Sequence, residues 1–291
     1  MRAPAKLAAF TALLAVCGGG AAVAGNAIDP DAPGRGGSSA SGENVAAAER
    51  EAAPHGHGGE AESHGEPEAA APAESASAKG LRMKLDDTTF AAGERAPLRF
   101  RIVGEDGTAR TDFEVEHEKR MHVIVVRTDL TGFQHLHPEM AKDGTWSVPL
   151  TLDEAGTYRV YADFADGTLS ADVKVPGDTH AHPLPPASTT TDAGDGYAVE
   201  LSGGEGARPG RELTLPFTVR KDGQEIEVEP YLGADGHLVA ISEGELEFLH
   251  VHPMDGAFMA TFPRAGKYRL FLQFQHAGKV RTAEFTQEVA G

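Results

Sequence analysis

The sequence predicts an all-β protein of two tandem Ig-like or cupredoxin-like β-sandwich modules, placed after an N-terminal export segment and a disordered tail. Three observations predict this fold class. One set of motifs occurs twice, about 115 residues apart. Each copy consists of short runs with two-residue hydrophobic alternation, separated by Gly, Asp and Pro turns. No window shows a helical period, and roughly 95 residues with seven or eight short strands are typical of a small sandwich.

The duplication is clearest in two histidine motifs. The first copy reads MHVIVV at 121–126 and FQHLHP at 133–138, and the second reads GHLVAI at 236–241 and FLHVHP at 248–253. From the first histidine to the Phe, His, His and Pro, the offsets are 11, 13, 15 and 16 residues in both copies. Such identical spacing indicates a tandem duplication.

The same patterns divide the chain into five parts. Residues 1–24 are expected to be a signal peptide or membrane anchor, 25–80 a disordered linker rich in His, Ala and Glu, 81–175 the first module, 176–195 a linker, and 196–291 the second module. In the first module we expect strands at 81–85, 98–103, 113–116, 121–127, 133–137, 145–150, 157–164 and 169–175.

The N-terminal segment predicts export. Arg2 and Lys6 precede an uncharged apolar stretch, and residues 22–24 form an A-x-A cleavage pattern. An uncleaved anchor and a lipoprotein modified at Cys17 are the open alternatives. In each case the remaining chain is extracytoplasmic, either secreted or held at the outer face of the cytoplasmic membrane. It would contact the membrane only through an uncleaved N-terminal segment.

Composition excludes several classes of function. The chain has 26 basic and 44 acidic side chains and a net charge of −18, which argues against nucleic acid as a partner. A single Cys excludes an intramolecular disulfide and any multi-Cys zinc or iron–sulfur site. The sequence contains no nucleophile motif, no phosphate-binding glycine loop and no carboxylate within the histidine motifs. We therefore expect a protein that is not an enzyme.

The histidine spacing predicts a geometry. A four-residue hairpin loop at 128–131 would place Ile124 opposite His135 and His122 opposite His137. Opposed residues of an antiparallel pair share a sheet face, as do residues i and i+2 of one strand. His122, His135 and His137 would then lie together on one face.

The second copy gives the same arrangement. Pairing Ser242 with Glu247 places His237 opposite His252, with His250 on the same face. Three imidazoles around one point suit Cu(II), Zn(II) or Ni(II). We therefore predict one three-His metal site per module, for copper, with zinc as a second possibility. The predicted ligands are His122, His135 and His137 in the first site, and His237, His250 and His252 in the second.

Other interpretations of the histidines remain open. A His at a half-buried sheet position also hydrogen-bonds to the backbone, and a His cluster also senses pH. With structural histidines, the chain would be a non-catalytic accessory module that contacts an envelope or membrane protein. His117 and His276 occur in one copy only and are left out of the predicted site. Tyr158 and Tyr268 resemble the tyrosine that pins a corner of Ig-like sandwiches.

The two histidine motifs, followed by the AGTYR and AGKYR turns at 155–159 and 265–269, resemble the YtkA-like domains. The resemblance covers about 55 residues of each copy. It implies an exported or membrane-tethered β-sandwich associated with heavy metals, copper above all. The chain is only distantly similar to periplasmic copper chaperones that use a His-Met pair and a later His-x-Met. Here the order is Met121-His122 and the later motif is His-x-His, which favours a nitrogen-rich site.

Overall fold

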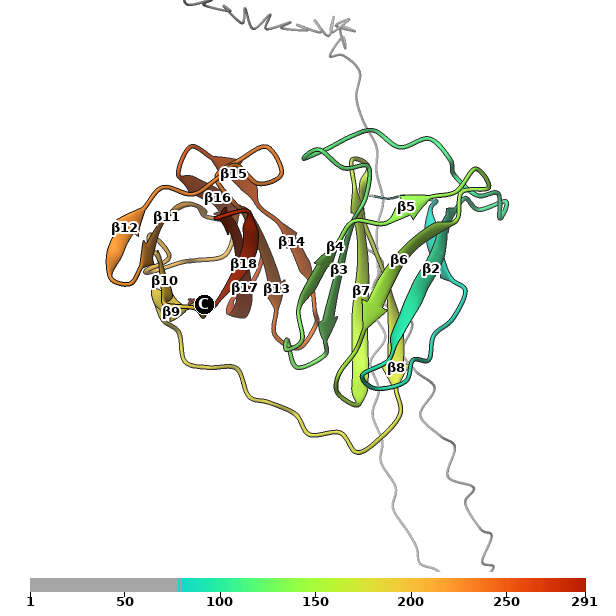
Figure 1. Ribbon diagram of the computed structural model, residues 1–291, viewed down its shortest axis with the longest axis horizontal. Coiled ribbons are helices and arrows are strands. Elements are labelled where there is room, and N and C mark those ends of the chain that lie inside the picture. Colours follow the sequence, from blue (N-terminus) through green and yellow to red (C-terminus); the bar gives the residue numbers. More distant parts are fainter. Residues whose placement is uncertain (1–77, 79) are drawn as a thin grey trace, which may run out of the picture. The chain divides into compact units, whose positions relative to one another are not determined.

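The computed structural model describes residue 78 and residues 80–291, and every regular element in this part of the chain is a β-strand (Figure 1). This confirms the all-β fold class. The predictions for residues 1–24, and nearly all of those for 25–80, lie outside the described residues. Both sandwich modules belong to one compact unit, Glu66–Gly291.

The first module consists of two four-stranded antiparallel sheets. Their strand orders are β1-β2-β6-β5 and β4-β3-β7-β8. The strands of the first sheet are β1 (Arg82–Leu85), β2 (Arg95–Val103), β6 (Trp146–Thr151) and β5 (Glu139–Met140). Those of the second are β4 (Gln134–Leu136), β3 (His122–Arg127), β7 (Gly156–Phe164) and β8 (Gly167–Val175). The apolar core between them includes Trp146, Phe100 and Val123.

The second module repeats this plan with a larger first sheet. That sheet has the order β15-β16-β11-β10-β9, with β12 also paired to β11, and the other sheet has the order β14-β13-β17-β18. The strands of the larger sheet are β15 (His252–Met254), β16 (Ala257–Thr261), β11 (Glu212–Lys221), β10 (Tyr197–Leu201), β9 (Thr190–Asp192) and β12 (Gln224–Ile226). Those of the other are β14 (Phe248–His250), β13 (His237–Ser242), β17 (Gly266–His276) and β18 (Lys279–Val289).

Two local expectations differ from the structure. The strand expected at 113–116 is absent, and only Glu116 pairs, in an isolated bridge with Lys119. The alternation there arises because Phe113 is buried against the Trp146 ring, at 5.1 Å between centroids, while its neighbours face solvent. In the predicted linker 176–195, β9 pairs with β10.

The predicted register of the two histidine hairpins is confirmed for the residues next to their loops. Ile124 lies opposite His135 in the β3–β4 pair. Val239 lies opposite His250 in the β13–β14 pair, and the Ser242 amide donates to the Glu247 carbonyl at 3.0 Å. A slip of one residue would have moved every histidine to the opposite face.

The buried Arg127 side chain holds the linker that follows the first module. The Arg127 side chain is 3% exposed and donates to Asp129 at 2.6 Å, to Glu154 and to the His180 carbonyl. The His182 amide donates to the same Asp129 carboxylate at 2.9 Å. The His-Ala-His stretch of the linker is therefore held through its main chain against the β3–β4 hairpin.

The corner-pinning role of the two tyrosines is also confirmed. The Tyr158 hydroxyl donates to the Glu154 carbonyl at 2.8 Å, and Tyr268 donates to the Arg264 carbonyl at 3.1 Å. Both bonds reach four residues back across the turn that opens β7 or β17.

Tyr158→Phe is expected to lower the free energy of unfolding by about 1 kcal/mol, because it removes one internal hydrogen bond and keeps the buried ring. Urea unfolding followed by fluorescence would measure the change. Tyr268→Phe makes the equivalent change in the second module and should give a similar loss. Unchanged midpoints in both variants would show that the corner bonds add nothing to stability.

Candidate metal centre

The histidine sheets of the two modules share a buried apolar cluster. Strands β3 and β13 lie at its centre. Its buried members are Ile124, Val126, Leu130 and Tyr161 from the first module, and Val239, Ile241, Leu246 and Phe271 from the second. The Tyr161 hydroxyl donates to the Leu246 carbonyl across this interface at 2.6 Å.

The interface contacts are reciprocal. Phe133 stacks on Phe271 with ring centroids 4.1 Å apart, and Tyr161 packs on Phe248 at 5.3 Å. In the repeat, Phe133 corresponds to Phe248 and Tyr161 to Phe271. Each contact is therefore the counterpart of the other, as in an interface with approximate two-fold symmetry.

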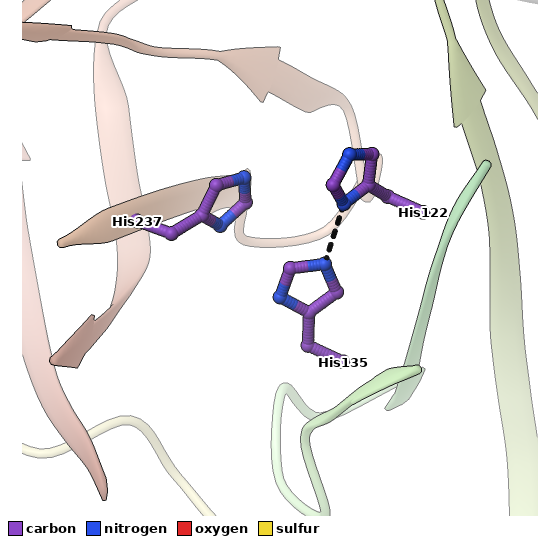
Figure 2. A group of neighbouring side chains, drawn as sticks. All are labelled: His122, His135 and His237. Atoms are coloured by element: carbon purple, nitrogen blue, oxygen red, sulfur yellow. Dashed lines mark hydrogen bonds between the residues drawn. The ribbon is translucent and has the colours of Figure 1, made fainter. Parts of the chain in front are cut away.

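This pairing brings equivalent histidines together. His122 and His237 occupy the same position in the two copies, and their rings stack at 5.7 Å with an interplanar angle of 10°. One ring nitrogen from each of His122, His135 and His237 lies within 4.8 Å of the other two (Figure 2). Two of these residues come from the first module and one from the second. His122 is 3% exposed, and His135 and His237 are partly exposed.

His122 and His135 each have an outer nitrogen, meaning the ring nitrogen that contacts an oxygen atom outside the group of three histidines. His122 Nε2 lies 3.2 Å from the Glu116 carbonyl oxygen, and His135 Nδ1 lies 2.6 Å from Gln273 Oε1. A carbonyl oxygen only accepts, so the tautomers that make both of these hydrogen bonds carry the ring proton on His122 Nε2 and on His135 Nδ1. A neutral imidazole has one N–H, and its second nitrogen holds a lone pair.

Counting protons leaves two lone pairs facing each other. His122 Nδ1 and His135 Nε2 are 3.0 Å apart, and both outer nitrogens have already used the single proton of their ring (Figure 2). In these tautomers, only a cation between the two nitrogens, a proton or a metal ion, makes this contact favourable. A proton would require one ring to be a buried imidazolium.

Burial opposes that proton. It lowers the pKa of His122, and with the neighbouring His137 it lowers the pKa of His135 to about 3. Burial also lowers the pKa of His137 to about 4, with His122 as the next contribution. At neutral pH these rings are uncharged and their lone pairs are available to a metal ion.

His137 and His117 extend the group. The His137 ring lies 4.7 Å from His135 and 5.1 Å from His122, and its buried Nε2 has no hydrogen-bond partner among the described residues. The His117 ring lies 6.2 Å from both His122 and His237. We call these five residues, His117, His122, His135, His137 and His237, the histidine cluster.

His117 was missed because its position depends on a turn. It has φ of 47° and the next residue, Glu118, has φ of 65°, in the turn that Glu116 and Lys119 close. Two consecutive left-handed residues favour Asn-Gly, so His-Glu there is strained, and such strain occurs often at functional sites. The only signal in the sequence was a histidine five residues before the motif.

The second predicted triplet is not assembled like the first. Strand β14 ends at His250, after which Val251 is buried in the core and the chain continues in the other sheet. His252 therefore lies in β15 opposite Met259 and is exposed, and His237 lies opposite Gln273 of β17. The predicted pairing of His237 with His252 is wrong for this reason. His250 is placed in β14 by its backbone.

Two copies of one family model match the chain, at residues 76–176 and 187–291. The chain belongs to this family. Its description is a domain of unknown function, DUF8832. The second DUF8832 copy begins at 187 and so includes β9, which the sequence analysis had placed in the linker.

Comparison with known proteins adds no function to the DUF8832 assignment. No curated protein matches the chain. A mutant of Salmonella alpha-2-macroglobulin is 16% identical with a TM-score of 0.28, over 76% of this chain and 16% of that one. The Escherichia coli adhesin FdeC is 14% identical with a TM-score of 0.27, over 73% and 64%. Domains 5–6 of the S-layer protein SbsC are 13% identical with a TM-score of 0.22, over 72% and 96%.

The chain thus spans less than two thirds of the length of the first two of these structures. The resemblance of the DUF8832 copies to YtkA-like domains stays a prediction. Within the described residues, no helix has the length and apolar character needed to cross a membrane.

Proposed function

We propose that this DUF8832 protein binds one divalent transition-metal ion, Cu(II) or Zn(II), at the histidine cluster between its modules, and that its role is binding rather than catalysis. The observation that carries the proposal is the 3.0 Å distance between His122 Nδ1 and His135 Nε2, two nitrogens whose lone pairs face each other when the other nitrogen of each ring donates to its oxygen partner. Ligand histidines usually donate their other N–H to a carbonyl or carboxylate oxygen, as both rings do here.

The distances fit a small cation. Zinc–nitrogen bonds of about 2.0–2.1 Å put two neighbouring imidazole nitrogens roughly 2.9–3.4 Å apart at angles of 90–110°. The His122–His135 distance of 3.0 Å lies in this range. The His237 nitrogen, within 4.8 Å, would need to move inward by roughly an ångström or two to complete a three-nitrogen site.

The ligand types favour copper. Imidazole suits both Cu(II) and Zn(II), and Cu(II) binds the more tightly of the two in a given nitrogen site. An extracytoplasmic location, which the N-terminal sequence predicts, would give the site access to copper outside the cytoplasm. We therefore place Cu(II) first, with the chain as an exported or envelope-anchored metal-binding protein.

A second candidate function rests on the same contacts, with the His122 ring proton placed on Nδ1 so that it donates to His135 Nε2. His122 contacts His135 within the first module, and His135 contacts Gln273 of the second module. These contacts therefore also hold the two modules together. In that case the chain is a non-catalytic tandem Ig-like accessory module of the cell envelope, and its partner is an envelope or membrane protein.

Titration of metal-stripped full-length chain with Cu(II) and with Zn(II) separates the two candidates. We expect one ion per chain at submicromolar affinity, and nitrogen hyperfine couplings in the EPR spectrum of the Cu(II) form. His237→Ala should weaken this binding although it alters only the second module, because the site is shared. Affinity in the micromolar range or weaker, unaffected by His237→Ala, would reject the metal site and leave the accessory function.

A further inference from the structure

We infer that the second module carries a separate, sulfur-rich site for Cu(I) on the outer face of the β15–β16 hairpin, formed by His252, Met254 and Met259. This site shares no residue with the histidine cluster. The two proposals can therefore be tested separately, and failure of one does not affect the other.

The strand register places the three side chains on one face. His252 lies directly opposite Met259, and Met254 is two residues along from His252 on the same strand. Opposed side chains have Cβ atoms about 4.5–5.5 Å apart, and a diagonal neighbour at roughly 7–8 Å is within reach of a long side chain. One imidazole nitrogen and two thioether sulfurs are therefore brought within reach of one point.

This face is directed away from the core. Phe258 and Ala260, on either side of Met259, are 1% and 2% exposed and point inward, so Met259 points outward by alternation. His252 is exposed, Met254 is 47% exposed, and Met259 is partly exposed. All three side chains are therefore at least partly open to solvent.

Packing does not account for these two sulfurs. Among the described methionines, Met121 is a buried member of the core of the first module, and Met83 and Met140 pack against it. Met254 and Met259 belong to none of the three apolar clusters, and Met254 is one of only three exposed large apolar residues in the described part of the chain. A buried methionine fills space, whereas an exposed one offers its sulfur to solvent.

The first module shows the same hairpin without sulfur. By strand register and repeat offset, its counterparts of His252, Met254 and Met259 are His137, Glu139 and Pro149. Only the second copy therefore combines the imidazole with two thioethers. Thioethers select soft Cu(I) over Zn(II), which distinguishes this site chemically from the histidine cluster.

Cu(I) binding to the full-length chain under anaerobic, reducing conditions tests the inference, with bicinchoninate as the competing chelator. The double variant Met254→Leu/Met259→Leu removes both sulfurs and keeps apolar side chains of similar volume. We expect it to lose one equivalent of Cu(I), or at least tenfold in affinity, while Cu(II) binding is unchanged. Met140→Leu, at a methionine that packs against the first core, should leave Cu(I) binding unchanged.

Methyl resonances of labelled methionines provide a direct second measurement. Cu(I) should shift the signals of Met254 and Met259 and leave those of Met83, Met121 and Met140 in place. The inference is overturned if the double variant binds Cu(I) like the parent chain, or if neither methyl signal moves at saturation. Loss of Cu(II) binding in His237→Ala would support the histidine cluster as a metal site and would leave the Cu(I) measurement as the test of the second site.

Discussion

His135→Ala is expected to lower the affinity for Cu(II) by at least about a hundredfold. Its Nε2 is one of the two nitrogens that face each other at 3.0 Å, and its Nδ1 is held by Gln273 of the other module at 2.6 Å. Loss of a residue that only orients a ligand typically costs 10–100-fold in metal affinity, so loss of a ligand should cost no less. Isothermal titration of metal-stripped protein would measure the change.

Two controls separate a ligand from a structural residue in this experiment. His180→Ala removes an exposed linker imidazole whose residue contacts Arg127 through its carbonyl, so it should leave Cu(II) affinity unchanged. Thermal unfolding without metal shows whether His135→Ala still folds. If the His135→Ala protein folds and keeps the parental affinity for Cu(II), His135 is not a ligand of the ion.

The sequence was sufficient for the local geometry of the site. The hairpin register follows from loop length and alternation, and these are local properties of residues 122–137. The positions of Ile124 and His135 opposite each other, and of the Ser242–Glu247 pair, were therefore predictable. Tyr158 and Tyr268 were predictable for the same reason, because each bonds only four residues back.

The sequence pattern within each module did not predict that histidines of both modules come together. This arrangement depends on two separate sheets packing through Ile124, Val239 and their neighbours, and apolar alternation alone does not say which sheet faces pair. The prediction of one complete triplet per module assigned His237 to a separate site, whereas in the structure one of its ring nitrogens lies within 4.8 Å of those of His122 and His135. The same packing brings two further residues next to the histidines. His117 comes from a strained turn, and Gln273 comes from β17, the neighbour of β13.

Coupling between docking and metal binding follows from this arrangement. Ring nitrogens of histidines from both modules lie within 4.8 Å of one another, and the shared apolar cluster contains residues of the strands that carry them. An ion that binds only the docked form stabilises docking by the free energy of its binding. A substitution that loosens the apolar cluster should consequently weaken the site without touching any histidine.

Phe271→Ala is the substitution that tests this coupling. Phe271 is fully buried and stacks on Phe133 at 4.1 Å between the modules. Its truncation should lower the free energy of unfolding by about 3–5 kcal/mol, because it leaves a cavity in the interface. Since β17 also carries Gln273 and lies beside β13, which carries His237, Cu(II) affinity of the folded protein should fall as well. Urea unfolding and Cu(II) titration would measure the two effects.

Phe262→Ala provides the matched control for the coupling. Phe262 is equally buried, but it lies in the internal core of the second module and contacts Tyr268 at 4.8 Å. Its truncation should cost a similar free energy of unfolding, about 3–5 kcal/mol. It should nevertheless leave Cu(II) affinity close to the parental value, because the interface is intact. Equal losses of affinity in the two variants would mean that general destabilisation, and not loss of module docking, weakens the site.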